Sequence, residues 1–343
     1  MKRTVIFFTA ALCLLWGCAK KDNSTTGTQA QEYLNLWLSQ CHPGVTASST
    51  GVYILEEEVG SGSAWNSETP ISLLLTTIRG LGGVITATGH EEYAKQLGTY
   101  VEGNYYGPVV TYTQNGYAGV EALLTGMRIG GTRTAVVPAW LLTTERYSSQ
   151  KEYLEACTNS THLIYTITLA GQASDITKWE QNSVEEYIQR NLGSTVQVAS
   201  FNDDTKEDKL FWFGSNAASA QQGQEAIGSG KKYKLNYTGR LLNGQVFDTS
   251  IEKVDKDNGI YDSSRTYAPV TITTADSYEN FALDGSTSIV DGFKGALSLM
   301  KYVGEQATVL FTSALGYSTT GRGSTIPPYA PLRFDLEIVS LSE

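Results

Sequence analysis

Two segments of the chain place apolar side chains at helical spacing, and each segment ends at a signal that stops a helix. Residues 31–40 hold tyrosine, leucine and tryptophan and are followed by His-Pro-Gly at 42–44. Residues 175–192 repeat this pattern and end at Gly193. Apolar residues three and four positions apart form one face of a helix, and glycine or proline ends it. The pattern therefore predicts two amphipathic helices, one near the start of each half of the chain.

The signals that follow the first helix recur, in the same order, after the second. In each half there is a short apolar run before a Gly-Ser-Gly, then a short helix with one apolar face, then a strand that alternates apolar and polar residues. The matched segments are 52–55 with 210–213, 119–127 with 292–300, and 163–169 with 332–338. A repeat of this length indicates an internal duplication. We therefore expect the α+β class, with two domains that each wrap a curled antiparallel sheet on a short helix.

Residues 1–17 have the composition of a targeting segment. Lys2 and Arg3 precede an apolar run, residues 4–16, that is too short to span a bilayer as a mature helix. The run ends in Leu-Trp-Gly-Cys at 15–18, which resembles the lipobox of bacterial lipoproteins. This resemblance implies lipidation of Cys18, and each buried methylene of an acyl chain adds about 0.8 kcal/mol to membrane anchoring. An ordinary secretory signal peptide with a chance cysteine is the alternative.

Composition and charge limit the classes of partner. The chain is 41% hydrophobic and 17% charged, which suits a globular protein. Its formal net charge of −10 becomes more negative without Lys2 and Arg3, so we expect its surface to repel nucleic acid. The three histidines lack metal-ligand spacing with the cysteines or with one another, so we expect no metal and no cofactor. The sequence leaves open whether Cys41 and Cys157 pair, and what the oligomeric state is.

The second half contains a series of short segments with the residue types of a binding pocket. Positions 233, 235 and 237 alternate with polar residues, so Tyr237 is predicted to face inward, and Asn243-Gly244 predicts a hairpin turn. The returning strand brings Phe247 and Asp248. A glycine-containing loop and Ile-Pro-Pro precede the last strand.

Four motifs in this half carry a specific resemblance. They are Tyr-Thr-Gly at 237–239, Gly-Gln-Val-Phe-Asp-Thr-Ser at 244–250, Gly-Arg-Gly-Ser-Thr-Ile-Pro-Pro at 321–328 and Leu-Arg-Phe-Asp-Leu at 332–336. Their order resembles the FKBP family of peptidyl-prolyl isomerases over about residues 210–343, and the first half is a weaker echo. The resemblance implies an antiparallel sheet curled round a helix, with an apolar pocket for a proline ring between them.

The resemblance also assigns roles to individual residues. Phe293 is expected to form the floor of the pocket, and Asp248 and Tyr317 to supply its polar groups; these three are the expected catalytic residues. The expected substrate-binding residues form the walls and rim of the pocket or present a backbone amide: Tyr237, Phe247, Ile289, Val290, Ile326 and Phe334. One more wall residue stays undecided between Val270 and Phe281, because long insertions flank it.

These residue types suit the isomerisation of an X-Pro bond, because the rotation breaks no covalent bond and needs no nucleophile. The barrier is the lost amide resonance, about 18–20 kcal/mol. A dry apolar wall favours the twisted, less polar amide over the planar ground state. The Tyr317 hydroxyl and the Val290 amide are expected to hold the substrate, while Asp248 orients that network or faces the rotated carbonyl carbon. Proline-containing polypeptides are therefore the expected substrates.

The first half lacks the pocket residues at the places that the repeat assigns to them. Thr77 takes the place of the pocket tyrosine, Ile85-Thr86 that of Phe-Asp, and Val120 that of the aromatic floor. Trp-Leu-Leu at 140–142 replaces Gly-Tyr, and a charged segment at 145–157, expected to form a small helix, replaces Ile-Pro-Pro. We expect a retained fold that serves binding, dimer contact or spacing.

A pocket rebuilt for another ligand is the alternative for the first half. Its candidate surface residues are Trp140, Tyr105 and Tyr106.

Together these patterns divide the chain into five parts. They are a signal peptide at 1–17, a flexible tether at 18–30, a degenerate FKBP-like domain at 31–172, a linker helix at 173–195 and an FKBP-type isomerase domain at 196–343.

We expect a foldase of the bacterial cell envelope that is anchored to a membrane through lipid on Cys18. Ala19 is not the aspartate associated with inner-membrane retention, which favours the outer membrane, facing the periplasm or the cell surface. A non-catalytic polypeptide-binding or envelope-interaction lipoprotein is the competing hypothesis. The insertions at 251–268 and 273–288 motivate it.

Overall fold

The computed structural model describes residues 26–113, 118–143, 147, 149–156, 161–199 and 210–342. The predicted signal peptide, Cys18 and Cys157 lie outside these residues, while Cys41 lies exposed at the end of the first helix. Within the described part of the chain, no helix combines the length and apolar character needed to cross a bilayer.

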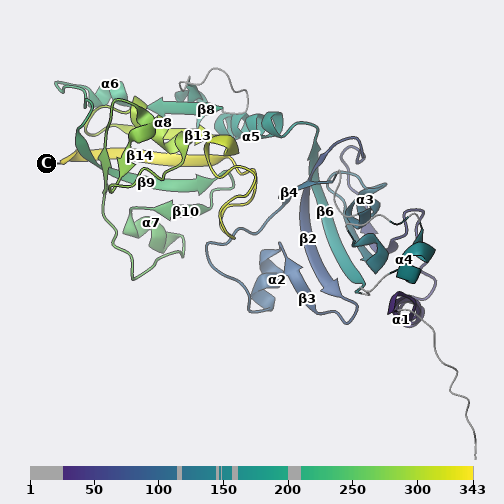
Figure 1. The fold of residues 1–343 in the computed structure, drawn as a ribbon. Helices are drawn as coiled ribbons and strands as arrows, with labels where there is room; N and C mark the ends of the chain where they lie inside the picture. Colours follow the sequence, from purple (N-terminus) through teal and green to yellow (C-terminus); the bar gives the residue numbers. More distant parts are fainter. Residues whose placement is uncertain are drawn as a thin grey trace, which may run out of the picture.

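Two antiparallel sheets, one from each half of the chain, form the framework of the molecule (Figure 1). The first half contains α1 (Thr26–Cys41), β1 (Tyr53–Glu58), β2 (Ile71–Gly80), β3 (Ile85–Thr88), α2 (Glu91–Gln96), β4 (Val109–Tyr112), α3 (Ala118–Leu124), β5 (Thr132–Val137), α4 (Gln150–Ala156) and β6 (Leu163–Ala173). The second half contains α5 (Ile176–Asn191), β7 (Gln197–Val198), β8 (Phe211–Ser215), α6 (Ala217–Ala220), β9 (Lys232–Leu241), β10 (Val246–Thr249), α7 (Glu252–Asp257), β11 (Val270–Thr273), β12 (Ala282–Leu283), α8 (Asp291–Leu299), β13 (Gln306–Phe311) and β14 (Leu332–Ser342). The predicted α+β class is confirmed, and α1 and α5 are the two predicted amphipathic helices. The predicted end of the tether at residue 30 was wrong, because α1 already begins at Thr26.

The two sheets have matching strand orders. The first sheet runs β1-β5-β6-β2-β3, and β4 also pairs with β2. The second sheet contains the series β8-β13-β14-β9-β11, and β10 also pairs with β9. Each strand of the first sheet therefore has a counterpart in the second, with β3 matching β10 and β4 matching β11. Such a one-to-one match is what an internal duplication produces.

A short helix packs against the inner face of each sheet, and a glycine lets it approach closely. A Cβ added at Gly292 of α8 would meet the ring of Phe311 at 2.3 Å, and one added at Gly119 of α3 would meet Val137 at 2.6 Å. Both distances are too short for any side chain. In the second half α8 buries Phe293 and Leu297 in a core that contains aromatic side chains from β8, β9, β13 and β14.

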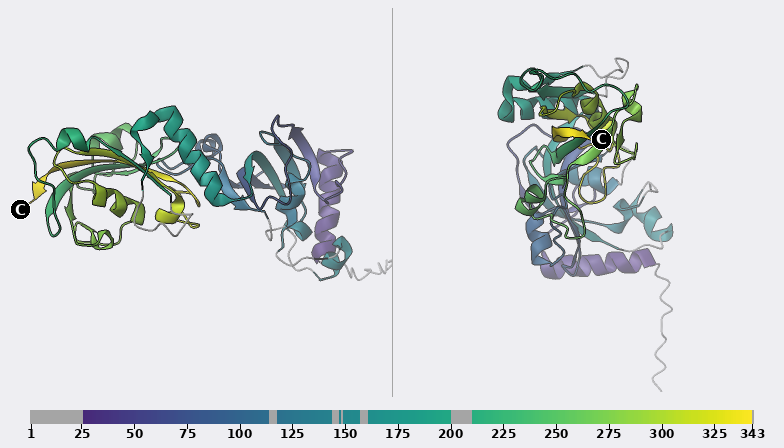
Figure 2. Two further views of the ribbon diagram at one scale, coloured as in Figure 1. Left: turned by 90° about the horizontal axis from the view of Figure 1, so that it is seen from above. Right: turned by 90° about the vertical axis from the view of Figure 1, so that its left-hand side faces the viewer.

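A longer helix covers the outer face of each sheet (Figure 2). Leu34 and Leu38 of α1 pack against Ile164 of β6, and Val184 and Ile188 of α5 pack in the same way against β8 and β13. The alternation of apolar and polar residues at 163–169 predicts a strand with one buried face, and this prediction is wrong for Ile164 of β6, which is 3% exposed. The reason is that a sheet covered by helices on both sides buries both sets of alternating side chains.

Candidate active site

Four aromatic side chains from different elements meet at one end of the second sheet. Tyr237 comes from β9, Phe247 from β10, Phe293 from α8 and Phe334 from β14. The ring of Phe293 lies edge-on to those of Tyr237 and Phe334, with centroids 5.8 and 5.0 Å apart, and the ring of Phe247 lies edge-on to Phe334 at 5.5 Å. Edge-to-face contacts at these distances stabilise an aromatic cluster. The structure thus brings together the predicted walls and floor.

A cavity of about 410 Å³ opens beside this cluster. Its lining combines apolar and charged side chains: Phe247, Asp248, Arg265, Arg322, Thr325 and Ile326. Ile326 is 1% exposed, and Ile289 and Val290 lie half-buried against the same core. A volume of this size accommodates a proline ring with its neighbouring peptide groups.

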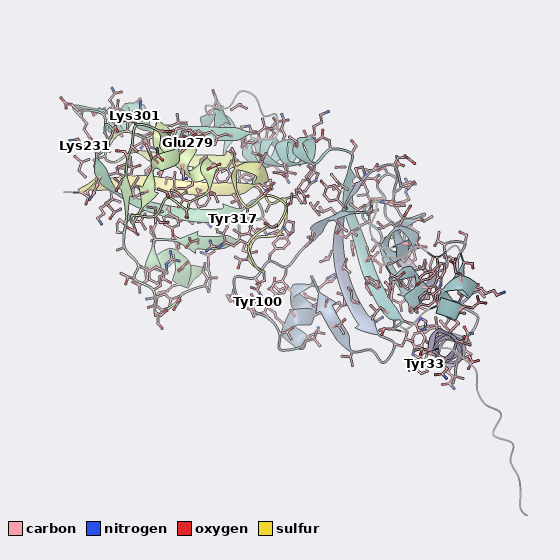
Figure 3. All side chains as sticks on the ribbon, in the orientation of Figure 1. Tyr33, Tyr100, Lys231, Glu279, Lys301 and Tyr317 are labelled. Carbon is pink, nitrogen blue, oxygen red and sulfur yellow. The ribbon has the colours of Figure 1, made fainter. Side chains whose placement is uncertain are left out.

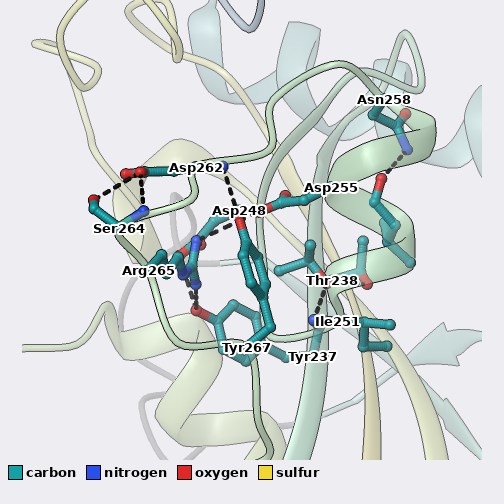
Figure 4. A network of polar contacts seen from close by, with 12 residues as sticks. Tyr237, Thr238, Asp248, Ile251, Asp255, Asn258, Asp262, Ser264, Arg265 and Tyr267 are labelled. Atoms are coloured by element: carbon teal, nitrogen blue, oxygen red, sulfur yellow. Dashed lines mark hydrogen bonds and ion pairs between the residues drawn. The ribbon is translucent and has the colours of Figure 1, made fainter.

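Three polar side chains form a closed network at the mouth of the cavity (Figure 4). The Tyr237 hydroxyl donates to Oδ2 of Asp248 at 3.0 Å, Nη1 of Arg265 lies 2.7 Å from Oδ1 of Asp248, and Nη2 of Arg265 donates to the Tyr237 hydroxyl at 3.1 Å. Burial of the phenol, together with the negative charge of Asp248, raises the pKa of Tyr237 above its usual value near 10. Tyr237 therefore stays protonated and fixes the orientation of the Asp248 carboxyl group.

Arg265 lines the cavity, and the sequence did not predict it as a site residue. It belongs to the insertion 251–268, which folds back over the pocket, and its guanidinium also lies 5.4 Å from the ring of Tyr267. The backbone before it is held in a turn, because Oδ1 of Asp262 accepts hydrogen bonds from the backbone N–H and the hydroxyl of Ser264 at 2.8 and 2.7 Å. The sequence does show an arginine directly after Asp-Ser-Ser at 262–264. It does not show which residue that arginine pairs with, because this depends on how the insertion folds.

Tyr317 is the first residue of the rim loop, which we define as residues 317–328. Nη1 of Arg322 donates to the Tyr317 hydroxyl at 3.2 Å, so that the hydroxyl hydrogen itself is directed elsewhere. The loop turns tightly, since the Arg322 N–H bonds to the Ile326 carbonyl at 2.8 Å. Gly321 has φ +64°, and a Cβ there would meet the Ile326 carbonyl oxygen at 2.2 Å, so this turn requires glycine.

The two candidates for the additional wall residue both contact the aromatic core. Phe281 is 7% exposed, and Val270, on β11 beside Leu235 of β9, is half-buried against the same cluster. Neither of them lines the 410 Å³ cavity.

The first half lacks the pocket residues, as predicted. The alignment of its β2 and β3 with β9 and β10 differs by one residue from the alignment that the sequence predicted. In each half, two threonine hydroxyls on neighbouring strands form a hydrogen bond. These pairs, Thr238 with Thr249 at 2.9 Å and Thr77 with Thr88 at 2.8 Å, identify equivalent positions in the two sheets. Thr77 therefore matches Thr238. The positions of Tyr237, Phe247, Asp248 and Phe334 are held by Thr76, Thr86, Ala87 and Tyr165. The assignment of Thr77 and of Ile85-Thr86 was wrong, because two successive threonines in β2 give no sign of which one faces the core.

The insertion after β10 also has a counterpart in the first half. Lys95 lies over the ring of Tyr100 at 4.6 Å as Lys256 lies over Tyr261 at 4.7 Å. A second tyrosine follows six residues after the first in each half, and its hydroxyl accepts a hydrogen bond from a backbone N–H. The N–H of Val101 donates to Tyr106, and the N–H of Asp262 donates to Tyr267. By this match Asn104 holds the place of Arg265. The first half therefore lacks the arginine, the carboxylate and the tyrosine of the network together.

Comparison with known proteins agrees with this geometry. Residues 223–339 match the family model described as FKBP-type peptidyl-prolyl cis-trans isomerase. The chain is 32% identical over 125 residues to the macrophage infectivity potentiator of Trypanosoma cruzi, covering 34% of this chain and 50% of that protein. It is 30% identical over 121 residues to the FK506-binding protein of Neisseria meningitidis serogroup A, covering 35% of this chain and 88% of that protein. The crystal structure of FkpA from Escherichia coli is similar at a TM-score of 0.31 with 17% identity, covering 49% of this chain and 62% of that one.

The fold and the pocket define an α+β domain with a cavity that apolar and charged side chains line together. The chain belongs to the FKBP family of peptidyl-prolyl cis-trans isomerases, and the match lies in its second half.

Proposed function

We propose that the second half of the chain isomerises X-Pro peptide bonds in polypeptides. The observation that carries this proposal is the 410 Å³ cavity, which joins the half-buried side chain of Phe247 and the buried side chain of Ile326 to the carboxyl group of Asp248 at its mouth. The apolar walls hold the proline ring out of water. They also favour the twisted amide, which is less polar than the planar one.

The polar residues position the substrate in this mechanism. The Tyr317 hydroxyl accepts from Arg322, which leaves its hydrogen free to be donated to a substrate carbonyl. Val290 precedes α8 in an extended conformation and presents its backbone amide next to the floor residue. Tyr237 and Arg265 fix Asp248, so that its carboxyl group faces the rotating carbonyl without having to reorganise.

The activity is tested with a proline-containing tetrapeptide and with proline-limited refolding of a small protein. Wild type is expected to accelerate both, and the Asp248→Val, Tyr317→Ala double variant to lose most of that acceleration. The matched control is Asp276→Val, Tyr33→Ala, which changes the same residue types at exposed positions that do not line the cavity. A wild-type rate equal to that of buffer in both assays would remove the proposal.

We also propose that the protein acts in the bacterial cell envelope as a lipid-anchored foldase, with lipid on Cys18. The targeting segment and the polar tether support this location. A Cys18→Ser variant is expected to move from the membrane fraction to the soluble fraction and to lose incorporation of labelled fatty acid. Equal fractionation of the variant and the wild type would contradict lipid anchoring.

The division into a degenerate domain at 31–172, a linker helix at 173–195 and an isomerase domain at 196–343 is part of the same proposal. Its support is the pair of matched strand orders, with Glu180 of α5 bonded to Ser313 of the second half.

A further inference from the structure

A loop of the first half is docked on the rim of the cavity in the second half. The backbone N–H of Tyr105 donates to the Ser324 carbonyl at 2.8 Å, and the Ser324 hydroxyl donates to Oδ1 of Asn104 at 2.6 Å. Nε2 of Gln245, in the turn before Phe247, donates to the Gly103 carbonyl at 2.7 Å. Figure 1 shows the loop before β14 reaching the segment between α2 and β4, and Figure 3 labels Tyr317 and Tyr100 on the two sides of this junction.

The two halves pack closely at this junction. A Cβ added at Gly103 would meet Ile260 at 2.9 Å, and one added at Gly259 would meet Glu102 at 2.8 Å. Both glycines have positive φ, +83° and +71°, so the backbone requires glycine there as well. Tyr105 is also half-buried against the core of the second half. The surface of the first half beside this loop therefore lies next to the cavity.

That surface is hollowed into a groove of about 330 Å³. Its lining comes from β3, α2, the docked loop and the rim of the second half: Ile85, Thr86, Ala87, Thr88, Ala94, Leu97, Thr99, Asn104, Tyr105, Tyr106 and Ser324. Thr86 and Ala87 hold the register positions of Phe247 and Asp248, and both are exposed. Leu97 is 46% exposed, and Val84 beside β3 is 72% exposed. Small residues therefore line this groove at the register positions that Phe247 and Asp248 hold in the second half.

We propose that this groove binds an extended, apolar segment of the same polypeptide whose X-Pro bond occupies the cavity. The proposal rests on the proposed isomerase function. Ser324 lines the groove and Thr325, the next residue, lines the cavity, so the two hollows meet at the rim loop. An extended chain advances about 3.3 Å per residue, so a few residues beyond the proline bridge the two sites. With the groove included, the proposed substrate is an unfolded polypeptide and not an X-Pro dipeptide alone.

The chemistry of the groove favours a polypeptide as its occupant. β3 is the end strand of the first sheet in the described part of the chain, where it pairs with β2 alone. An end strand offers backbone N–H and C=O groups that an extended peptide pairs with, while Leu97 and Ile85 contact its apolar side chains. Unfolded polypeptides expose both kinds of group, whereas folded proteins bury them.

The test compares a groove variant with a matched control in the full chain. The groove variant is Leu97→Ser, Ala87→Arg, which removes an apolar contact and fills the groove. The control is Leu36→Ser, Ala170→Arg, which makes the same changes at an exposed helix position, 55% exposed, and at an exposed position of β6. All four positions are exposed, so both variants are expected to fold. The readouts are kcat/KM for a tetrapeptide, kcat/KM for proline-limited refolding, and the Kd of a permanently unfolded polypeptide.

The groove variant is expected to keep the tetrapeptide kcat/KM within about twofold of wild type, because a tetrapeptide fills the cavity alone. Its refolding kcat/KM is expected to fall, and its Kd for the unfolded polypeptide to rise, by about tenfold. The control is expected to match wild type in all three measurements. Equal Kd and equal refolding in groove variant and control would overturn the groove proposal. Wild type that binds the unfolded polypeptide through the groove but isomerises neither substrate would instead overturn the isomerase proposal.

Discussion

Nη1 of Arg265 lies 2.7 Å from Oδ1 of Asp248, although an insertion with its own helix, α7, separates the two residues in the chain. The arginine side chain is 35% exposed and the aspartate side chain 28% exposed. An ion pair that is this exposed contributes little to stability. Its contribution is to orientation, because the same guanidinium also bonds to Tyr237.

Replacement of Arg265 is therefore expected to affect catalysis more than stability. We expect Arg265→Ala to lower kcat/KM for a tetrapeptide about tenfold, while the free energy of unfolding changes by less than about 1 kcal/mol. Arg265→Lys is expected to rescue little, because an ammonium group cannot bond to Asp248 and Tyr237 in the same planar arrangement. Arg190→Ala, at an exposed helical ion pair, is the control. Unchanged kcat/KM in Arg265→Ala would refute the positioning role.

Two buried tyrosines are expected to make the fold sensitive to alkali. Burial raises the pKa of Tyr233 and of Tyr237 above the usual value of 10.0, so the folded protein holds these phenolic protons more tightly than the unfolded chain does. The free energy of unfolding should therefore be unaffected by these groups below pH 10 and should fall as the pH rises above it. Denaturant unfolding from pH 8 to pH 11 measures this dependence.

Tyr233→Phe tests the same point at one residue. Tyr233 is fully buried, and its hydroxyl has no hydrogen-bond partner among the described residues. We expect the variant to be as stable as wild type at pH 7, or more stable by up to about 1 kcal/mol, and to lose less stability above pH 10. Tyr33→Phe, on the exposed side of α1, is the control. A loss of stability at pH 7 would show that the hydroxyl has a partner.

Gly292→Ala is expected to separate α8 from the sheet. The added Cβ would lie 2.3 Å from the ring of Phe311, which stacks on Phe334 at 5.8 Å, so the floor of the cavity moves with the helix. We expect a loss of about 2 kcal/mol or more in the free energy of unfolding, and a higher KM for the tetrapeptide. Gly228→Ala is the control, because nothing lies within 4 Å of a Cβ there. Equal stability of the two variants would contradict the close approach of helix and sheet.

Glu180 is expected to anchor α5 to the second half. It is 3% exposed and accepts hydrogen bonds from the backbone N–H and the hydroxyl of Ser313 at 2.6 and 2.7 Å. Glu180→Ala removes the carboxylate that accepts from these buried donors. We expect the free energy of unfolding, measured by chemical denaturation, to fall by about 2–3 kcal/mol. Glu186→Ala, on the exposed face of the same helix, should cost less than about 0.5 kcal/mol. Similar losses in both variants would argue against the anchoring role.

The features that the sequence predicted are those that depend on local spacing. Leu34 and Leu38 of α1 and Val184 and Ile188 of α5 lie on buried helix faces, as their separation of four residues predicts. Tyr233, Leu235 and Tyr237 alternate inward on β9. The aromatic cluster was expected from the resemblance to the FKBP family, which assigned Phe247 and Phe334 to the walls of one pocket.

The features that the sequence did not predict depend on contacts between distant segments. The register of Thr76 and Thr77 depended on pairing with β3, since both residue types fit either face of a strand. Arg265 and its partners became adjacent only when the insertion folded back over β9 and β10.

By itself the sequence determined the helices and the alternating strands, because these follow from the period of a helix or strand. The residues of the pocket were predicted from the resemblance of four motifs to the FKBP family. Only the tertiary structure decided that Asn104 and Tyr105 of the first half rest on Ser324 at the edge of that pocket. Contacts of this kind join segments far apart in the chain through a few hydrogen bonds and close packing, and no periodicity in the sequence records which surfaces will meet.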